Sequence, residues 1–222
     1  MRTFRLVLWA FVVIVAASSV GVWVGKTFLT PEQNDVASGL AGAFARSYYA
    51  EAGGPFTLTN TAGETVTEQD YRGKPLAMFF GFTHCPDVCP TALFDASNWL
   101  KALGDDAEKL QVVFVSVDPE RDRPDILGRY VGAFDKRIDG LTADTDEQIR
   151  EITNRYKVQY QRVPLSNGDY TVNHTADTLL FDKDGEFAGF IPYMAPNLRQ
   201  NETAAANERE RAMQQLRNLV AS

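Results

Sequence analysis

Thiol and imidazole groups are scarce in this sequence, so chemistry that needs them has few candidate residues. The 222-residue chain has two cysteines, Cys85 and Cys89, and two histidines, His84 and His174. Three residues separate the cysteines, so their sulfurs can face one centre, as a disulfide or as two ligands of one ion. A purely stabilising disulfide is disfavoured, because it would close a very short loop and the entropic gain grows with loop length. The pair is therefore predicted to be functional.

Spacing alone leaves two kinds of chemistry open for this pair. Disulfide exchangers normally have Cys-x-x-Cys, which is one residue shorter than this motif, and a thiol peroxidase would need a hydroxyl where this chain has Phe82. Two thiolates and an imidazole would instead suit copper, whereas tetrahedral zinc usually needs a fourth ligand. His174 is the remote candidate for the third donor, since the side chain of His84 should diverge from that of its neighbour Cys85.

The elements that must position these residues alternate between strands and helices. The apolar runs 76–82 and 112–117 predict two strands buried on both faces. Apolar residues at helical intervals predict helices over 91–103, 124–134, 144–156 and about 203–220. Turn residues at 167–168 and 184–185 predict hairpins. This order predicts an α/β domain whose mixed central sheet carries helices on both faces.

The cysteine motif follows the first predicted strand and enters the first predicted helix. Pro90 is tolerated only in the first turn of a helix, so regular helix should begin near Cys89. The positive end of the helix dipole would then favour the thiolate of Cys89. Sites in open α/β sheets form where strands end and helices begin, which makes this junction the predicted site.

The N-terminus predicts a membrane anchor or a leader. Residues 6–25 contain no charge and follow Arg2 and Arg5, and as a helix they would span about 30 Å, one hydrocarbon core. The basic residues would keep the short end in the cytoplasm and place the rest outside. Small residues at 16–19 offer a cleavage site, but the apolar run is longer than the core of a leader, which favours the uncleaved anchor. We expect an anchor over 1–29, a linker over 30–54 and a folded domain over 55–222.

Composition and charge exclude several classes of protein. A content of 45% hydrophobic and 23% charged residues excludes a disordered chain and a many-pass membrane protein. The chain has 22 basic and 29 acidic residues, and three of the basic ones precede residue 30. The folded domain is therefore acidic and has no basic run, so nucleic acid is not an expected partner.

Three motifs in this order resemble the Sco/SenC family, whose members assemble the copper centre of cytochrome c oxidase. They are FGFTHCPDVCP at 80–90, VSVDPERD at 115–122 and YTVNHT at 170–175, and the resemblance covers about 54–191. It implies a thioredoxin-like fold in which the loop of His174 faces the cysteine motif. It also implies that Cys85, Cys89 and His174 bind one Cu(I) or Cu(II).

The resemblance extends to two residues beside the ligands. Asp118 matches an acid that the family has near the site, and its alternative role is that of a turn residue before Pro119 at the end of a strand. Asn173 stands where the family commonly has Asp; it can accept a hydrogen bond but carries no charge that would support the imidazole.

The resemblance implies a periplasmic copper chaperone, anchored in the bacterial inner membrane, that delivers copper to the dinuclear site of cytochrome c oxidase subunit II. Other periplasmic copper chaperones or thioredoxin-like reductases are implied as further partners. One alternative is a thiol-disulfide reductase that keeps the cysteines of that subunit reduced, which would make the protein an enzyme. Another is a redox or copper sensor. All three use Cys85 and Cys89, whereas only the chaperone needs His174.

Overall fold

The computed structural model describes residues 42–166, 168–194 and 196–222. The chain divides into two compact units, residues 1–47 and 48–222, and the described part of the first, residues 42–47, is helical. The predicted membrane segment, residues 6–25, lies outside the described residues. Within the described ranges no helix is both long enough and apolar enough to cross a membrane.

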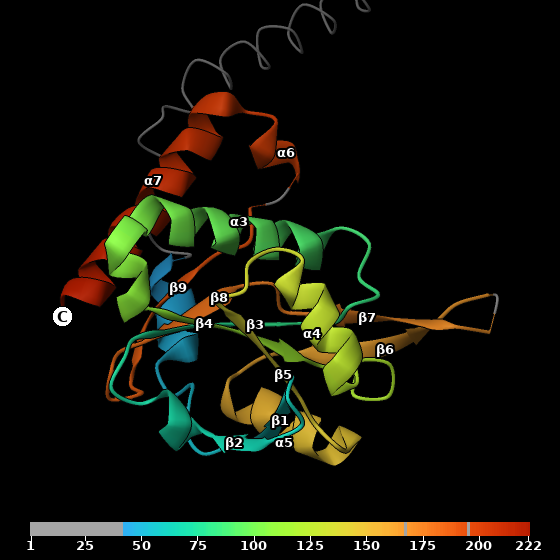
Figure 1. Cartoon of the computed structure of the whole chain (residues 1–222). Coiled ribbons are helices and arrows are strands. Elements are labelled where there is room, and N and C mark those ends of the chain that lie inside the picture. The colour runs from blue at the N-terminus through green and yellow to red at the C-terminus, as the bar shows by residue number, and fades with distance from the viewer. Residues whose placement is uncertain (1–41, 167, 195) are drawn as a thin grey trace, which may run out of the picture. The chain divides into compact units, whose positions relative to one another are not determined.

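The described part of the second unit is built on a seven-stranded mixed sheet with the strand order β2-β1-β5-β4-β3-β8-β9 (Figure 1). Its strands are β1 (Thr57–Asn60), β2 (Thr65–Thr67), β3 (Leu76–Gly81), β4 (Gln111–Ser116), β5 (Ile138–Thr142), β8 (Thr178–Phe181) and β9 (Phe187–Ile191). The central strands β3, β4 and β5 run parallel, and the outer strands pair antiparallel with their neighbours. The predicted mixed central sheet is confirmed.

Helices cover both faces of this sheet. They are α3 (Val88–Leu103), α4 (Pro124–Gly132), α5 (Asp146–Arg155), α6 (Pro196–Arg199) and α7 (Glu202–Ala221), with short 3-10 helices η1 (Glu68–Tyr71) and η2 (Gly104–Lys109). Figure 1 shows α3 and α7 above the sheet and α5 below it. Successive strand residues face opposite sides: the Phe80 ring packs on Tyr156 after α5, and Gly81 faces Cys89 of α3.

The two predicted central strands are buried throughout, as their apolar sequences indicate. All six residues of β3 are buried, and so are five of the six in β4. Each strand ends one residue earlier than predicted, at Gly81 and Ser116. The motif residues that follow these strands therefore leave the sheet at adjacent positions, because Gly81 pairs with Ser116 in the parallel register.

Three strands were not predicted, and the packed core begins before the predicted start of the domain at residue 55. β1 and β2 are short and half-polar, and β5 contains Asp139 and Gly140, so none has the apolar run that identifies a buried strand. Tyr49 and Ala52, which belong to the predicted linker over 30–54, are buried in the core. Packing against the domain therefore begins before residue 55.

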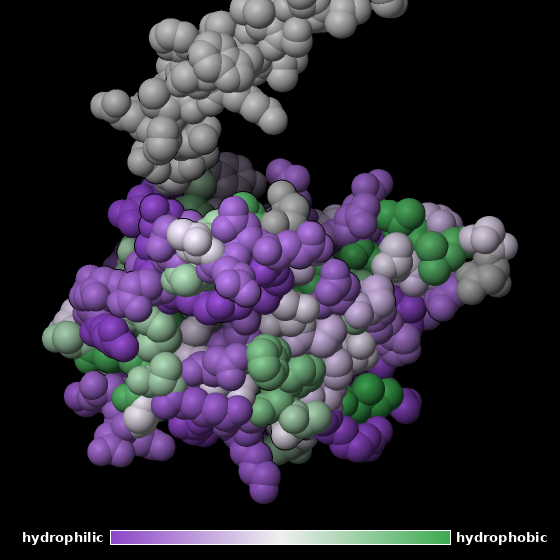
Figure 2. All heavy atoms as spheres, turned by 90° about the horizontal axis from the view of Figure 1, so that it is seen from above, coloured by the Kyte–Doolittle hydropathy of each residue, from purple (hydrophilic) through white to green (hydrophobic). Residues whose placement is uncertain are grey.

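A hairpin outside the main sheet carries His174. Among the described residues, β6 (Tyr160–Pro164) and β7 (Tyr170–His174) pair only with each other, as a two-stranded sheet in which Tyr160 lies opposite His174. Figure 1 shows this hairpin extending beyond the end of the main sheet, and Figure 2 shows it at the edge of a largely hydrophilic face. The base of the hairpin, and not its tip, therefore lies nearest to the cysteine motif.

Candidate metal centre

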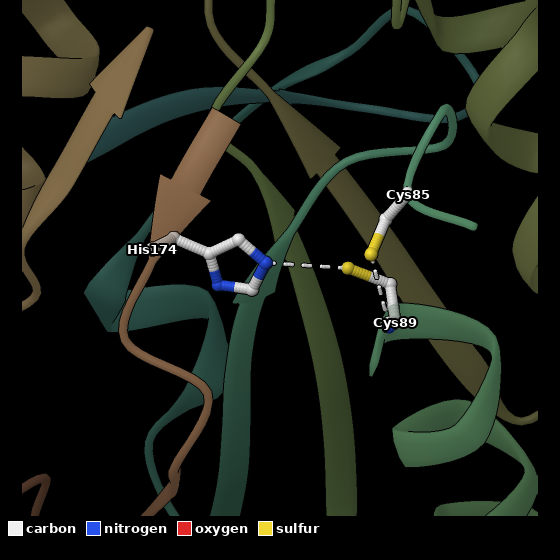
Figure 3. A group of neighbouring side chains, drawn as sticks. All are labelled: Cys85, Cys89 and His174. Atoms are coloured by element: carbon white, nitrogen blue, oxygen red, sulfur yellow. Dashed lines mark hydrogen bonds between the residues drawn. The ribbon is translucent and has the colours of Figure 1, made fainter. Parts of the chain in front are cut away.

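Two thiols and one imidazole converge at the end of β3. One ligand atom each of Cys85, Cys89 and His174 lie within 4.8 Å of one another. The Sγ of Cys89 is 3.4 Å from Nε2 of His174. Figure 3 shows the imidazole reaching from the end of β7 toward the two sulfurs, which come from the loop after β3 and the first turn of α3. The structure thus brings together the three residues named as ligands from the sequence.

The start of α3 positions the two cysteines. The helix begins at Val88, which puts Pro90 in its first turn as the sequence predicts. The backbone N–H of Cys89 donates to Sγ of Cys85 over 3.4 Å, so the first sulfur caps the turn that carries the second. The cysteines are reduced, and Cys85 is half-buried whereas Cys89 is buried. Cys85 is therefore the thiol that a partner can reach.

A buried carboxylate that the sequence left unassigned holds the loop before Cys85. Asp122 is fully buried and accepts hydrogen bonds from the backbone N–H of Thr83 over 2.9 Å and from the hydroxyl of Thr83 over 2.5 Å. It also accepts from the hydroxyl of Ser116 over 2.6 Å. Asp122 therefore ties the loop after β3 to the end of β4. Asp122 is the last residue of the motif VSVDPERD, and its place in that motif was the sequence feature that could have identified it.

The hydrogen bonding of His174 leaves one nitrogen free to act as a ligand. Its Nδ1 lies 2.8 Å from the carbonyl oxygen of Thr175, which can only accept, so Nδ1 carries the proton. Nε2 then has a lone pair directed at Cys89. The imidazole also lies edge-on to the rings of Phe79 and Phe82, with centroids 6.0 and 5.8 Å away. These contacts fix both the tautomer and the ring orientation.

The two thiols have opposite acid–base properties. Hydrogen bonds from the side chain and the backbone N–H of Cys89 lower the pKa of Cys85 to about 3, although burial opposes this shift. Burial raises the pKa of the Cys89 thiol, and the neighbouring Cys85 raises it further. The metal-free site therefore holds one thiolate at Cys85 and one protonated thiol at Cys89. A metal bound by both sulfurs would displace the proton of Cys89.

His84, Asp118 and Asn173 lie beside the site without joining its donor set. The side chain of His84 is 53% exposed, and its Nδ1 lies 4.0 Å from the carboxylate of Asp122. Asp118 is buried and bonds Arg121 and Tyr170. Asn173 is exposed on β7, and the Nδ1 partner of the neighbouring His174 is a backbone carbonyl.

The donor set fits copper by its chemistry. Two sulfurs suit a soft ion such as Cu(I), and an imidazole suits both Cu(I) and Cu(II). Within the described ranges the group that meets metal-ligand spacing contains three side chains, one fewer than a structural zinc site usually uses. Copper is therefore the metal that these residues fit best.

Comparison with known proteins gives a consistent family match. A family model described as SCO1/SenC matches residues 45–210. The mitochondrial protein SCO2 of Saccharomyces cerevisiae is 41% identical over 146 residues, which cover 64% of this chain and 48% of that protein. The mitochondrial SCO1 homolog of Homo sapiens is 40% identical over 161 residues, which cover 69% of this chain and 51% of that protein. The chain thus spans about half the length of these two relatives.

Solved structures with the same fold include copper-bound proteins. ScoI of Bradyrhizobium japonicum with copper bound is 43% identical, with a TM-score of 0.61 over 72% of this chain and 98% of that one. Yeast Sco1 with copper bound is 34% identical, with a TM-score of 0.59 over 64% of this chain and 80% of that one. The apo Sco1 protein of Thermus thermophilus is also 34% identical, with a TM-score of 0.61 over 74% and 91%.

Proposed function

The chain belongs to the SCO1/SenC family, and we propose that it is a copper carrier that binds one copper ion through Cys85, Cys89 and His174. The observation that carries this proposal is the convergence of two sulfurs and one imidazole nitrogen within 4.8 Å. The copper-bound state of ScoI from Bradyrhizobium japonicum, which is 43% identical, supports the choice of metal. The mixed sheet with helices on both faces is consistent with the thioredoxin-like fold of the family.

The site suits both oxidation states of its cargo. Two thiolates are strong ligands for Cu(I), and the imidazole of His174 adds the borderline donor that Cu(II) prefers. Cys85 enters binding already deprotonated, so it is Cys89 that releases a proton as the metal binds. Affinity therefore falls as the pH is lowered, because a proton competes with the metal for this sulfur.

The burial of the ligands suits a carrier that gives up its metal. Cys85 and His174 are partly exposed, whereas Cys89 is fully buried. Ligands of a recipient protein would therefore approach from the side of Cys85 and His174, and Cys89 would release the ion last. The recipient that the family resemblance supports is the dinuclear copper site of cytochrome c oxidase subunit II. The uncharged segment over 6–25 supports an anchor in the bacterial inner membrane with the domain in the periplasm.

The asymmetry of the cysteines favours a second candidate function, reduction of a disulfide in the same oxidase subunit. The thiolate of Cys85 would attack one sulfur of the disulfide and release the other as a thiol. Cys89 would then lose its proton and attack Sγ of Cys85 in the mixed disulfide, which releases the second substrate sulfur as a thiol. The Cys85–Cys89 pair is thereby oxidised to a disulfide and the substrate is reduced. A thioredoxin-like reductase would supply the two electrons for the next cycle. His174 would not be required as a ligand for this reaction.

A copper titration of the reduced chain tests the carrier. Wild type should bind one Cu(II) with intense thiolate charge-transfer absorption and a paramagnetic resonance signal. Cys85→Ala and Cys89→Ala should weaken Cu(I) and Cu(II), and His174→Ala should weaken Cu(II) more than Cu(I). His84→Ala is the matched control, because it removes the second imidazole of the chain, next to Cys85. It should change the affinity for neither Cu(I) nor Cu(II). An unchanged Cu(II) spectrum in His174→Ala, with loss in His84→Ala, would contradict the proposed site.

A disulfide-reduction assay separates the two candidate functions. The extra residue between the cysteines predicts slow turnover of a peptide disulfide by the metal-free wild type. If the metal-free protein reduced the peptide as fast as thioredoxin does, and His174→Ala kept this rate, disulfide reduction would be the better supported of the two functions. Slow turnover together with tight, His174-dependent Cu(II) binding would support the carrier.

A further inference from the structure

In the part of the chain that the structure describes, the strand of His174 has no backbone pairing with the main sheet, whose strand β3 leads into the cysteine motif. β6 and β7 form a separate two-stranded sheet, whereas the cysteine motif follows β3 of the seven-stranded sheet. The chain returns to the main sheet at Thr178, so the base of the hairpin is tied by three intervening residues. Backbone hydrogen bonds to the main sheet therefore do not fix the direction in which the β6–β7 hairpin points. Side-chain contacts must therefore hold β7 across the site.

Three residues supply such contacts, and we name them the Asp118 clamp: Asp118, Arg121 and Tyr170. The fully buried carboxylate of Asp118 accepts from Nε of Arg121 over 2.5 Å and from the hydroxyl of Tyr170 over 2.7 Å. The guanidinium of Arg121 lies 3.8 Å from the centre of the Tyr170 ring, and its Nη1 donates to the Tyr170 carbonyl over 3.0 Å. Tyr170 is thus held by its hydroxyl, its ring and its backbone.

The partner strand of the hairpin is attached to the turn after β4 and to the first residue of α5. Arg162 on β6 donates to Glu120 over 3.2 Å and to Asp146 over 2.9 Å, and it lies 4.8 Å from the centre of the Tyr170 ring. Glu120 and Asp146 are exposed, so water and salt screen their attraction for Arg162, whereas Nη2 of Arg162 also lies 3.7 Å from the buried carboxylate of Asp118. Asp118 has no exposure and the Arg121 side chain only 16%, so their ion pair is screened far less. The clamp is therefore the stronger attachment.

The strand period places the clamp and the metal ligand on one face of β7. Tyr170 and His174 are four positions apart, and residues at even separations in a strand share a face. Asp118 and the cysteine motif follow β4 and β3, which are parallel neighbours with Ser116 opposite Gly81. β7 therefore crosses the carboxyl ends of both strands. Tyr170 meets Asp118 after β4, and His174 meets Cys89 after β3.

We propose that Asp118, Arg121 and Tyr170 are positioning residues that set the reach of His174 to the two sulfurs. This inference rests on the proposed copper site. When the clamp is closed, the imidazole completes the donor set. When the clamp is broken, β7 turns about residues 175–177, and the cysteines remain as a two-sulfur site. The clamp therefore controls the preference between the oxidation states, because the imidazole matters most for Cu(II).

Two conservative variants and one matched control test this proposal in the full chain. Tyr170→Phe removes the hydroxyl bond to Asp118 and keeps the ring under Arg121. Arg121→Lys keeps the positive charge but loses the planar guanidinium, which stacks on the Tyr170 ring and donates hydrogen bonds to Asp118 and to the Tyr170 carbonyl. Tyr160→Phe is the control, because it removes a hydroxyl from the same hairpin directly opposite His174. That hydroxyl makes no hydrogen bond within the part of the chain that the structure describes.

The copper readout compares the two oxidation states. Both clamp variants should weaken Cu(II) by about 10- to 100-fold, the usual effect of removing a partner that orients a ligand. Cu(I) affinity should stay close to that of wild type, and Tyr160→Phe should change neither. The proposal is overturned if Cu(I) and Cu(II) fall equally, or if Tyr160→Phe has the same effect as Tyr170→Phe.

Hydrogen exchange in the metal-free protein tests the hold on the hairpin without copper. The backbone amides of Thr171 and Asn173, which lie at the hydrogen-bonded positions of the β6–β7 ladder, should exchange faster in both clamp variants, with β3 amides unchanged. If exchange and Cu(II) affinity both stay at the wild-type level, the clamp does not position His174. Faster exchange with undiminished Cu(II) affinity also overturns the proposal. If wild type binds Cu(II) without His174, the proposed function fails, whereas the exchange rates still report the contact between the clamp and the hairpin.

Discussion

Gly81 and Cys89 are so close that the sulfur occupies the space of a missing side chain. A Cβ atom on Gly81 would lie 2.8 Å from Sγ of Cys89 and 2.8 Å from the ring of Phe114. Neither neighbour can move freely, because Cys89 is in the first turn of α3 and Phe114 is fully buried in β4. The last residue of β3 therefore has to be glycine for the sulfur to stay in place.

We expect Gly81→Ala to displace the Cys89 sulfur and to damage both folding and metal binding. Overpacking of this kind costs about 1–3 kcal/mol in the free energy of unfolding. Copper affinity should fall for both oxidation states, because both use Cys89. Denaturant unfolding and copper titration measure the two effects. Gly132→Ala in α4 is the control, since a Cβ there meets nothing within 4 Å, and equal losses in the two variants would contradict this account.

The acid–base asymmetry of the thiols predicts a distinctive thiolate titration. Because the pKa of Cys85 is lowered to about 3, its ultraviolet thiolate absorbance should persist in mild acid and disappear only as the pH falls toward that value. Cys89→Ala should move this step to higher pH, since the hydrogen bond from Cys89 is the largest cause of the shift. Cys85→Ala should abolish it. A single step near the ordinary thiol pKa in the metal-free wild type would show that Cys85 is not a stabilised thiolate.

Asp122 should be important for stability although it touches no ligand. Asp122→Ala would leave the buried hydroxyl of Ser116 and the N–H of Thr83 without their acceptor. Unpaired buried groups cost about 1–3 kcal/mol each, so we expect a loss of about 3 kcal/mol in denaturant unfolding. Asp125→Ala removes an exposed carboxylate that pairs with Arg129, and it should cost less than about 1 kcal/mol. Similar losses would contradict the role given to Asp122.

The uncharged run over residues 6–25 predicts that the protein stays with the membrane in high salt. Hydrophobic insertion is insensitive to ionic strength, whereas surface attachment by charge is screened. The domain should also be open to added protease on the periplasmic side of spheroplasts. Fractionation followed by mass measurement checks both expectations. A shortened form in the soluble fraction would show that the segment is a cleaved leader.

Much of the domain could be predicted because its signals are local. The continuous apolar runs identify β3 and β4, and Pro90 marks the first turn of α3. Apolar residues at helical intervals predict α7, whose buried residues are Ala205, Ala212, Leu216 and Leu219. β1, β2 and β5 were not predicted because none has a continuous apolar run, and because β1 and β5 depend on pairing with strands that are distant in the sequence. Strand pairing of this kind is set by tertiary contacts more than by local propensity.

The site divides in the same way between local and distant determinants. The sequence alone determined the Cys85–Cys89 pair, because four positions at a strand-to-helix junction bring two sulfurs to one side of a single turn. Only the tertiary structure decided that His174, 85 positions from Cys89, faces that sulfur. It also decided that Asp118 acts on Tyr170, and not on the imidazole. The physical reason is that β7 has no ladder to the main sheet, so buried side-chain contacts between distant segments set its direction.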